Sequence, residues 1–232
     1  MDIKQSAKES RDALQQGIYK VINPFVRLLI RLHFTPNMVT TIGFLGNVAG
    51  AVLIVLAGYG VTQGQPVDYA LLTWAGALII GFSLFDMLDG QVARLGGMAS
   101  TFGALYDSCL DRYCEFLTLG GIAYYFIGCG QMIPALVTFL AIVGSIMVSY
   151  VRARAEGLGI ECKVGFMQRP ERVVVTSLAT LAAGITGLNL NPASTFDPNW
   201  ILLAAMIIIA VFANITAFAR IAHCKRELAL RK

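Results

Sequence analysis

Four aspartates of this 232-residue chain are spaced so that they could act together. Asp86 and Asp89 are three residues apart, and Asp107 and Asp111 are four residues apart; Glu115 follows one helical turn later. On a helix, both spacings place the two side chains on one face. All five acids stand in or at the ends of apolar stretches, where charge is costly and usually serves a function. Converging carboxylates repel one another unless they bind protons or a cation.

The chemistry of such a cluster is limited by its oxygen ligands. Carboxylate oxygens suit hard cations such as Mg²⁺ or Mn²⁺. Two divalent ions about 3.5–4 Å apart are a known arrangement for phosphoryl transfer. The alternative is a proton or ion pathway, as in a cation-coupled transporter, and charge alone does not decide between the two. Transporters usually place their site near the bilayer midplane. The four aspartates instead cluster toward one interface, which favours an enzyme.

The elements that position these acids are apolar helices. The chain is 56% hydrophobic and 14% charged, whereas an average soluble domain carries roughly 25% charge. Its apolar residues fall in blocks of about 20, the length that spans the hydrocarbon core, and they lack the alternation of a β-barrel strand. We therefore predict an all-α, polytopic membrane protein with six transmembrane helices, at about 38–58, 67–89, 101–126, 131–155, 171–188 and 198–222.

The distribution of basic residues predicts the orientation. The loops near 59–66, 127–130 and 189–197 contain no Lys or Arg, whereas all 18 basic residues lie in or beside the other segments. The positive-inside rule then places both termini, and with them the aspartates, on the cytoplasmic side. The short connection at 90–100 makes the second and third helices antiparallel neighbours, so the two acidic faces can converge. The net charge of +4 is a membrane-surface feature, and we expect no nucleic-acid partner.

The first 34 residues are predicted to form a separate segment. Residues 1–34 are more charged than the rest, and Leu14, Ile18 and Val21 fall roughly on one face of a helix. Such an amphipathic helix could lie in the membrane interface before the first span. We therefore expect an N-terminal cytoplasmic, juxtamembrane helix in residues 1–34 and a six-helix domain in residues 35–232.

The stretch from Asp86 to Asp111 carries a resemblance to a known family. It reads D-x-x-D-G-x-x-A-R, then eight residues, then G-x-x-x-D-x-x-x-D, with no gap or substitution. This pattern resembles the signature of CDP-alcohol phosphotransferases. The resemblance implies a metal-dependent transfer from a CDP-linked lipid with release of CMP. By this resemblance two divalent ions, Mg²⁺ or Mn²⁺, are bound by Asp86, Asp89, Asp107 and Asp111. By the same resemblance, Asp111 is also the catalytic general base.

The same resemblance assigns a site for the CDP-lipid. Gly90 and Gly103 lack side chains, so a nucleotide or a neighbouring helix could approach the backbone closely. Arg94 could form a fork with phosphate oxygens, although a basic residue in this loop could also serve topology alone. The region before the first span, Thr35-Pro-Asn-Met-Val-Thr40, is also family-like. The residues expected to contact the CDP-lipid are Asn37, Asp89, Gly90, Ala93, Arg94 and Gly103.

Three further stretches resemble the phosphatidylinositol-phosphate synthases of the family. They are D-S-x-x-D-R from Asp107, S-Y-V-R-A-R-A-E from Ser149 and R-P-E-R from Arg169; the second departs from many relatives by an Arg in place of Lys. Arginines at the cytoplasmic ends of different spans could form a trap for an acceptor phosphate, or they could only set topology and contact headgroups. The residues expected to bind that phosphate are Ser149, Arg152, Arg172 and Arg220.

The resemblance thus implies an integral membrane phospholipid synthase. It would transfer a phosphatidyl group from CDP-diacylglycerol to inositol 1-phosphate in the bilayer of a prokaryotic cell, as a multi-pass protein of the cell membrane and as a homodimer. Glycerol 3-phosphate also carries a phosphate, so a phosphatidylglycerophosphate synthase stays open, as do phosphatidylinositol and phosphatidylserine synthases of the same family.

Overall fold

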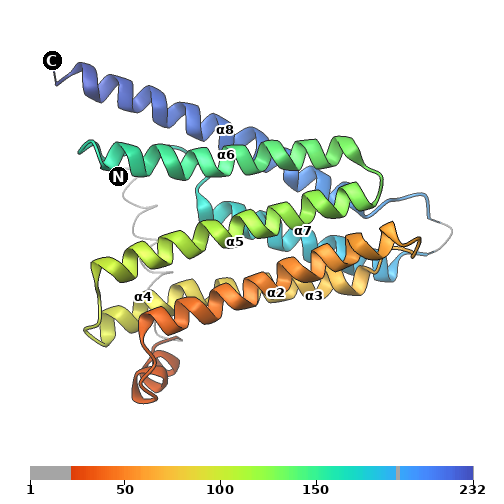
Figure 1. The fold of residues 1–232 in the computed structure, drawn as a ribbon, viewed down its shortest axis with the longest axis horizontal. Coiled ribbons are helices and arrows are strands. Elements are labelled where there is room, and N and C mark those ends of the chain that lie inside the picture. The colour runs from red at the N-terminus through yellow and green to blue at the C-terminus, as the bar shows by residue number, and fades with distance from the viewer. Residues whose placement is uncertain (1–21, 192–193, 232) are drawn as a thin grey trace, which may run out of the picture. The chain divides into compact units, whose positions relative to one another are not determined.

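The computed structural model describes residues 22–191 and 194–231, and this part of the chain is helical without β-strands. The all-α prediction is therefore confirmed. Residues 22–31 are helical, and seven further helices follow in the described chain (Figure 1). They are α2 (Pro36–Thr62), α3 (Tyr69–Ser83), α4 (Phe85–Leu95), α5 (Thr101–Gly128), α6 (Met132–Glu156), α7 (Arg169–Asn189) and α8 (Asn199–Ala229).

Five helical stretches are long and apolar enough to cross a membrane, so the chain is a multi-pass membrane protein. They are Pro36–Thr62, Tyr69–Leu95, Met132–Glu156, Arg169–Asn189 and Asn199–Ala229. The 28-residue helix α5 is also long enough, but its first 15 residues include Asp107, Asp111, Arg112 and Glu115. These charges keep α5 out of that group of five, and the three acids among them are ones that the sequence marked.

The second predicted span, 67–89, consists of two helices in the structure. Helix α3 ends at Ser83 and α4 begins at Phe85, although Leu84 between them keeps helical backbone angles (φ −69°, ψ −23°). Helix α3 is apolar throughout, whereas α4 is amphipathic and buries Leu88 and Val92 together with the polar Asp89. The interruption therefore separates the apolar part of the span from the part that carries the acidic motif.

The chain divides into two compact units. The described part of the first comprises residues 22–43 and 84–110, which include helix 22–31, the start of α2, all of α4 and the first turns of α5. Its apolar core joins these segments through Val26, Leu29, Val39, Leu88 and Val92. The helix before the first span is thus packed against α2 and α4. The predicted amphipathic helix falls mostly in residues 1–21, outside the described residues, and stays a prediction.

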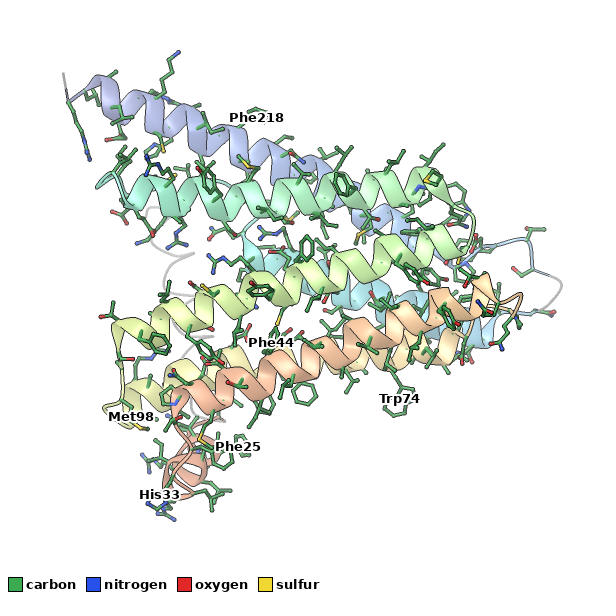
Figure 2. All side chains as sticks on the ribbon, in the orientation of Figure 1. Phe25, His33, Phe44, Trp74, Met98 and Phe218 are labelled. Carbon is green, nitrogen blue, oxygen red and sulfur yellow. The ribbon has the colours of Figure 1, made fainter. Side chains whose placement is uncertain are left out.

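The second unit contains the rest of the described chain, residues 44–83 and 111–231. Within it α3 packs on α7, α6 packs on α8, and α7 contacts α8. Its core contains a large apolar cluster, and it also buries polar side chains, including those of Arg172 and Arg220. Outward-facing side chains are apolar too, since Trp74 is 66% and Phe218 70% exposed (Figure 2). Apolar residues on both the inside and the outside of a helical unit are expected when lipid is the solvent.

Candidate active site

A pocket in the first unit gathers most of the residues expected to bind the CDP-lipid. Its volume is about 230 Å³, and it lies among the start of α2, helix α4 and the start of α5. Pro36 starts α2 without an amide N–H to satisfy, and this places the next turn of α2 along the pocket. The lining residues are Pro36, Asn37, Thr40, Asp89, Gly90, Ala93, Met98, Ala99, Ser100, Gly103, Ala104 and Asp107. Five of the six predicted contacts are among them.

Asp89 is held in this pocket by a threonine. The Thr40 hydroxyl lies 2.6 Å from Asp89 Oδ2 and donates to it. Thr40 Oγ1 is also 3.0 Å from the Pro36 carbonyl oxygen. Both side chains are buried, each at 5% exposure. A buried carboxylate needs such a donor, because an unsatisfied one is expensive. The contact fixes the Asp89 carboxylate relative to the first turn of α2.

The carboxylates of the first unit interact with one another. Asp86 and Asp107 both lie close enough to Asp89 for their negative charges to repel its carboxylate. As their side chains are oriented, no three His, Cys, Asp or Glu residues in the described chain converge closely enough to hold a metal ion. The donor set, all carboxylate oxygens, has the chemistry that hard divalent cations prefer. Joint ligation by the three aspartates would require their side chains to turn toward a common centre.

The two motif glycines stand at close approaches. A Cβ on Gly103 would lie 3.2 Å from Asn37 Oδ1 and 3.0 Å from Ser100 Oγ, so a side chain there would press on the pocket wall. A Cβ on Gly90 would lie 3.6 Å from Arg94 Nη2. Arg94 does not line the pocket, but its guanidinium extends back over Gly90, one turn earlier on α4. That position leaves a cation beside the pocket.

Asp111, which belongs to the second unit, forms an ion pair with the first residue of α7. Arg169 Nη2 lies 2.7 Å from Asp111 Oδ1, and the two side chains are 21% and 14% exposed. Both are thus largely shielded from water, so solvent screens their attraction less than that of a surface pair. The contact joins α5 to α7 and orients the carboxylate predicted to act as the base.

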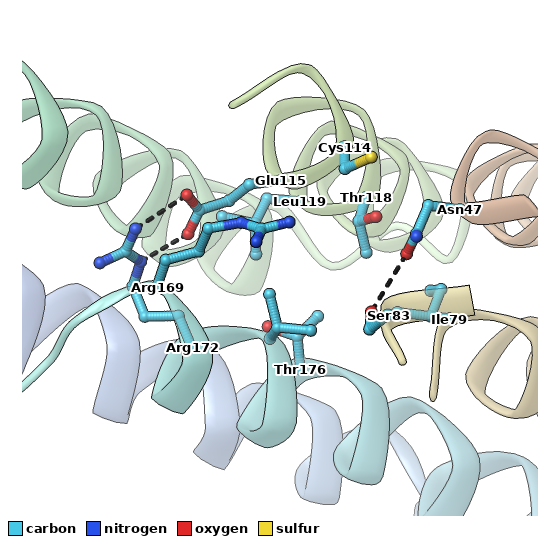
Figure 3. A pocket seen from close by; sticks show the side chains of 11 residues that line it. Asn47, Ile79, Ser83, Cys114, Glu115, Thr118, Leu119, Arg169, Arg172 and Thr176 are labelled. Atoms are coloured by element: carbon cyan, nitrogen blue, oxygen red, sulfur yellow. Dashed lines mark hydrogen bonds and ion pairs between the residues drawn. The ribbon is translucent and has the colours of Figure 1, made fainter. Parts of the chain in front are cut away.

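Arg172 forms a second ion pair one turn further along both helices. Its Nε and Nη2 donate to the two carboxylate oxygens of Glu115, the latter at 2.8 Å (Figure 3). Its Nη1 donates to the Met167 carbonyl at 3.1 Å. Arg172 is 1% exposed. A cavity of about 20 Å³, lined by Glu115, Arg169 and Arg172, adjoins the pair. That is about the size of one water molecule.

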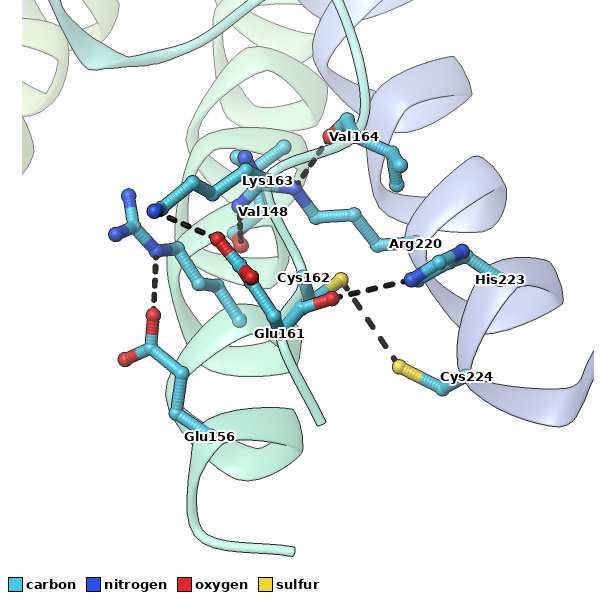
Figure 4. A network of polar contacts seen from close by, with 10 residues as sticks. Val148, Glu156, Glu161, Cys162, Lys163, Val164, Arg220, His223 and Cys224 are labelled. Carbon is cyan, nitrogen blue, oxygen red and sulfur yellow. Dashed lines mark hydrogen bonds and ion pairs between the residues drawn. The ribbon is translucent and has the colours of Figure 1, made fainter. Parts of the chain in front are cut away.

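The other predicted acceptor residues lie at the ends of α6 and α8. Arg220 is 2% exposed and donates to the carbonyls of Val164 at 2.9 Å and Val148 at 2.6 Å (Figure 4). Arg152 pairs with Glu156 at 2.9 Å. Both Arg152 and Arg172 repel the charge of Arg220, so the three arginines gather in the second unit. The fourth predicted residue, Ser149, is half-buried beside Val148.

Comparisons with known proteins identify the family. The family model of CDP-alcohol phosphatidyltransferases matches residues 33–215, which cover α2 to α7 and the first half of α8. The chain belongs to this family. It is 34% identical to a phosphatidylinositol phosphate synthase from Cutibacterium acnes, over 93% of this chain and 95% of the relative. It is 35% identical to an archaetidylinositol phosphate synthase from Methanothermobacter thermautotrophicus, over 75% and 83%.

Solved structures support the same assignment to CDP-alcohol phosphatidyltransferases. The phosphatidylinositol phosphate synthase of Mycobacterium tuberculosis with bound CDP-DAG is 28% identical and has a TM-score of 0.73, over 88% of this chain and 94% of that one. The same enzyme in complex with manganese and citrate gives a TM-score of 0.71 at 29% identity, over 87% of each chain. The match therefore includes the fold as well as the motif.

Thr40 and Arg169 of this phosphatidyltransferase were not expected at its sites from the sequence, and Glu115 was marked as an acid in an apolar stretch but was given no role. Thr40 lies three residues after Asn37 in the same family-like stretch, and that spacing could have marked it. Glu115 continues the spacing of Asp107 and Asp111 by one more turn, so it belongs to the same face of α5. Arg169 was recognised only as part of R-P-E-R. Its pairing with Asp111 spans 58 positions and leaves no local signal.

Proposed function

We propose that this enzyme is a phosphatidylinositol-phosphate synthase, which transfers the phosphatidyl group of CDP-diacylglycerol to inositol 1-phosphate and releases CMP. The observation that carries the proposal is the pocket of the first unit, where Asn37, Asp89, Gly90, Ala93 and Gly103 stand together. The names of the relatives, and the CDP-DAG bound in the mycobacterial structure, support both the donor and the reaction.

The reaction is an in-line displacement at the lipid-bearing phosphorus. An acceptor hydroxyl forms a new P–O bond, its proton passes to a base, and the bond to CMP breaks. We place the diphosphate of the donor in the pocket, with the Arg94 guanidinium and the open backbone at Gly90 and Gly103 beside it. Such a guanidinium forms strong, forked contacts with phosphate oxygens.

A divalent cation fits the donor set of this pocket. Asp86, Asp89 and Asp107, with Asp111 one turn later on α5, would hold Mg²⁺ or Mn²⁺, and the manganese complex of the mycobacterial relative supports this assignment. Such a cation neutralises diphosphate charge and makes CMP a better leaving group. The family pattern implies two ions. The hydroxyl of Thr40 keeps Asp89 in place through its 2.6 Å contact.

Asp111 is the proposed general base. A base must lie within hydrogen-bond reach of the hydroxyl that it deprotonates, and the ion pair with Arg169 fixes the orientation of the Asp111 carboxylate. The arginine also restricts the carboxylate, since one of its oxygens already accepts from the guanidinium.

The acceptor phosphate is assigned to the arginines of the second unit. Arg152 and Arg172 both lie close enough to Arg220 to repel its charge, and such a gathering of positive charge suits a phosphorylated acceptor. Arg152 is the most accessible of them, because Arg172 and Arg220 are buried and already donate to protein oxygens. We propose that Arg152 and Ser149 contact the phosphate directly. Arg172 and Arg220 would contribute charge and hold the surrounding helices.

The site is proposed to face the cytoplasm, with both termini on that side, and the protein to work as a homodimer. The absence of Lys and Arg from the three opposite loops supports the orientation, and family resemblance supports the dimer.

The test is an acceptor panel with purified protein, CDP-diacylglycerol and Mg²⁺ or Mn²⁺, followed by CMP release. Inositol 1-phosphate should be used in preference to glycerol 3-phosphate, serine and free inositol. A second panel should vary the donor lipid, because the archaeal relative is named for a different lipid class. Release of CMP with none of these acceptors would reject the proposed reaction.

A further inference from the structure

A groove in the second unit lies apart from the residues assigned above to donor and acceptor. It is bounded by the C-terminal ends of α6 and α8, which pack side by side (Figure 1). The cavity measures about 700 Å³. Its wall is formed by apolar side chains, among them Tyr150, Leu158, Ile221 and Leu228, and each of these four is more than 40% exposed.

Two cations line the same groove. Arg154 comes from the last turn of α6 and Lys225 from near the end of α8, and both are exposed. In the described ranges 22–191 and 194–231, neither lies within 4.0 Å of a carboxylate. In contrast, Arg152, two residues before Arg154 on α6, forms an ion pair with Glu156. The groove therefore combines an apolar wall with two positive charges that no acidic side chain of this part of the protein neutralises.

The position of these groups along the helices determines what could fill the groove. Met147, Tyr150 and Ile221 precede the two cations along their helices, on the side of the helix middle, whereas Leu158 and Leu228 follow them. The two cations stand near the helix ends, where long basic side chains reach the headgroup level of a bilayer. Both helices also end here, so their C-terminal carbonyls add partial negative charge that favours the retention of cations. An apolar wall capped by cations matches a ligand with an acyl chain and a negatively charged head.

We propose that this groove is a binding site for an anionic phospholipid, with an acyl chain along Met147, Tyr150 and Ile221 and the phosphate between Arg154 and Lys225. A soluble anion has no apolar part that would pack against the apolar wall. A zwitterionic lipid would bring an ammonium group toward two cations. A second copy of this chain docked through the same groove would bring two more cations against these two, and like charges repel.

The binding test uses the purified full-length protein titrated with phosphatidylglycerol or phosphatidylcholine in detergent micelles, with bound lipid counted by native mass spectrometry. Phosphatidylglycerol should bind more tightly than phosphatidylcholine. Arg154→Gln combined with Lys225→Gln should weaken phosphatidylglycerol binding about thirtyfold, since each basic residue near a membrane surface contributes about fivefold. Binding of phosphatidylcholine should be unchanged.

The matched control is Lys163→Gln combined with Arg226→Gln, which removes the same charge from exposed residues outside the groove. It should bind phosphatidylglycerol like the wild type. The exchange Arg154→Lys with Lys225→Arg keeps both charges and should also bind normally, which separates lost charge from lost folding. Equal loss in the control, equal affinity for both lipids, or a photo-crosslinker at Leu228 that captures a second copy of the chain would each overturn the proposal.

Discussion

The hydroxyl of Thr40 donates to Asp89 Oδ2 at 2.6 Å, and this contact ties the first turn of α2 to the acidic motif on α4. Both side chains are buried. Because the contact restrains a carboxylate proposed to bind metal, Thr40 is a positioning residue: it acts on the reaction through Asp89.

Thr40→Val should therefore impair metal use more than folding. Losing the donor to a charged acceptor costs about 1.5–3 kcal/mol, which corresponds to roughly ten- to a hundredfold in the Mn²⁺ concentration required for half-maximal CMP release. Thr40→Ser should restore most of the affinity. A suitable control is Thr138→Val, because Thr138 is equally buried but donates only to the Pro134 carbonyl within α6. An unchanged Mn²⁺ requirement in Thr40→Val would show that Thr40 does not position a metal ligand.

The aspartates themselves should be essential. Asp86→Asn and Asp107→Asn should each abolish CMP release, since each removes a charged ligand from a shared cation site. Folding should survive, because the loss of a mutually repulsive acid seldom destabilises a protein. Thermal unfolding and CMP release should be measured on the same preparations. Undiminished turnover of the wild type in excess chelator would contradict the metal assignment.

Arg172 pairs with Glu115 and is proposed to add charge at the acceptor site, and a single substitution would affect both. Arg172→Ala should leave Glu115 buried and unpaired, at a cost of about 3–5 kcal/mol in the free energy of unfolding. The double variant Arg172→Met with Glu115→Gln should recover much of that stability. If Arg172 contributes charge to the acceptor site, the double variant should still show a KM for inositol 1-phosphate raised about tenfold or more, with the KM for CDP-diacylglycerol little changed. Full recovery of the acceptor KM would make Arg172 purely structural.

The sequence predicted the helical membrane fold because apolar blocks of the right length are a local property of the chain. It also located Asp86, Asp89 and Gly103 through fixed spacing within a short stretch. It did not predict the interruption at Leu84, since the residues on both sides favour helix. It could not pair Arg172 with Glu115 or Arg169 with Asp111, because these contacts join α7 to α5 across more than 50 positions. Such partners depend on how the helices pack.

The proposed orientation can be tested by labelling. Single cysteines introduced at Gln63 and Asn191, in a background without the native cysteines, should react with a membrane-impermeant maleimide added to the outside of intact cells. Both positions lie in loops without Lys or Arg. A cysteine at Lys163 should react only after the cells are opened. Reaction of Lys163→Cys in intact cells would contradict the proposed orientation and support the opposite one.

The central claim concerns the acceptor, and competition measures it most directly. Purified protein with CDP-diacylglycerol and Mn²⁺ should be offered inositol 1-phosphate and glycerol 3-phosphate together, and the two lipid products should be separated and counted. We predict that phosphatidylinositol phosphate dominates, and that Arg152→Ala lowers its formation through the acceptor KM. A majority of phosphatidylglycerophosphate would contradict the acceptor assignment and leave membership of the family intact.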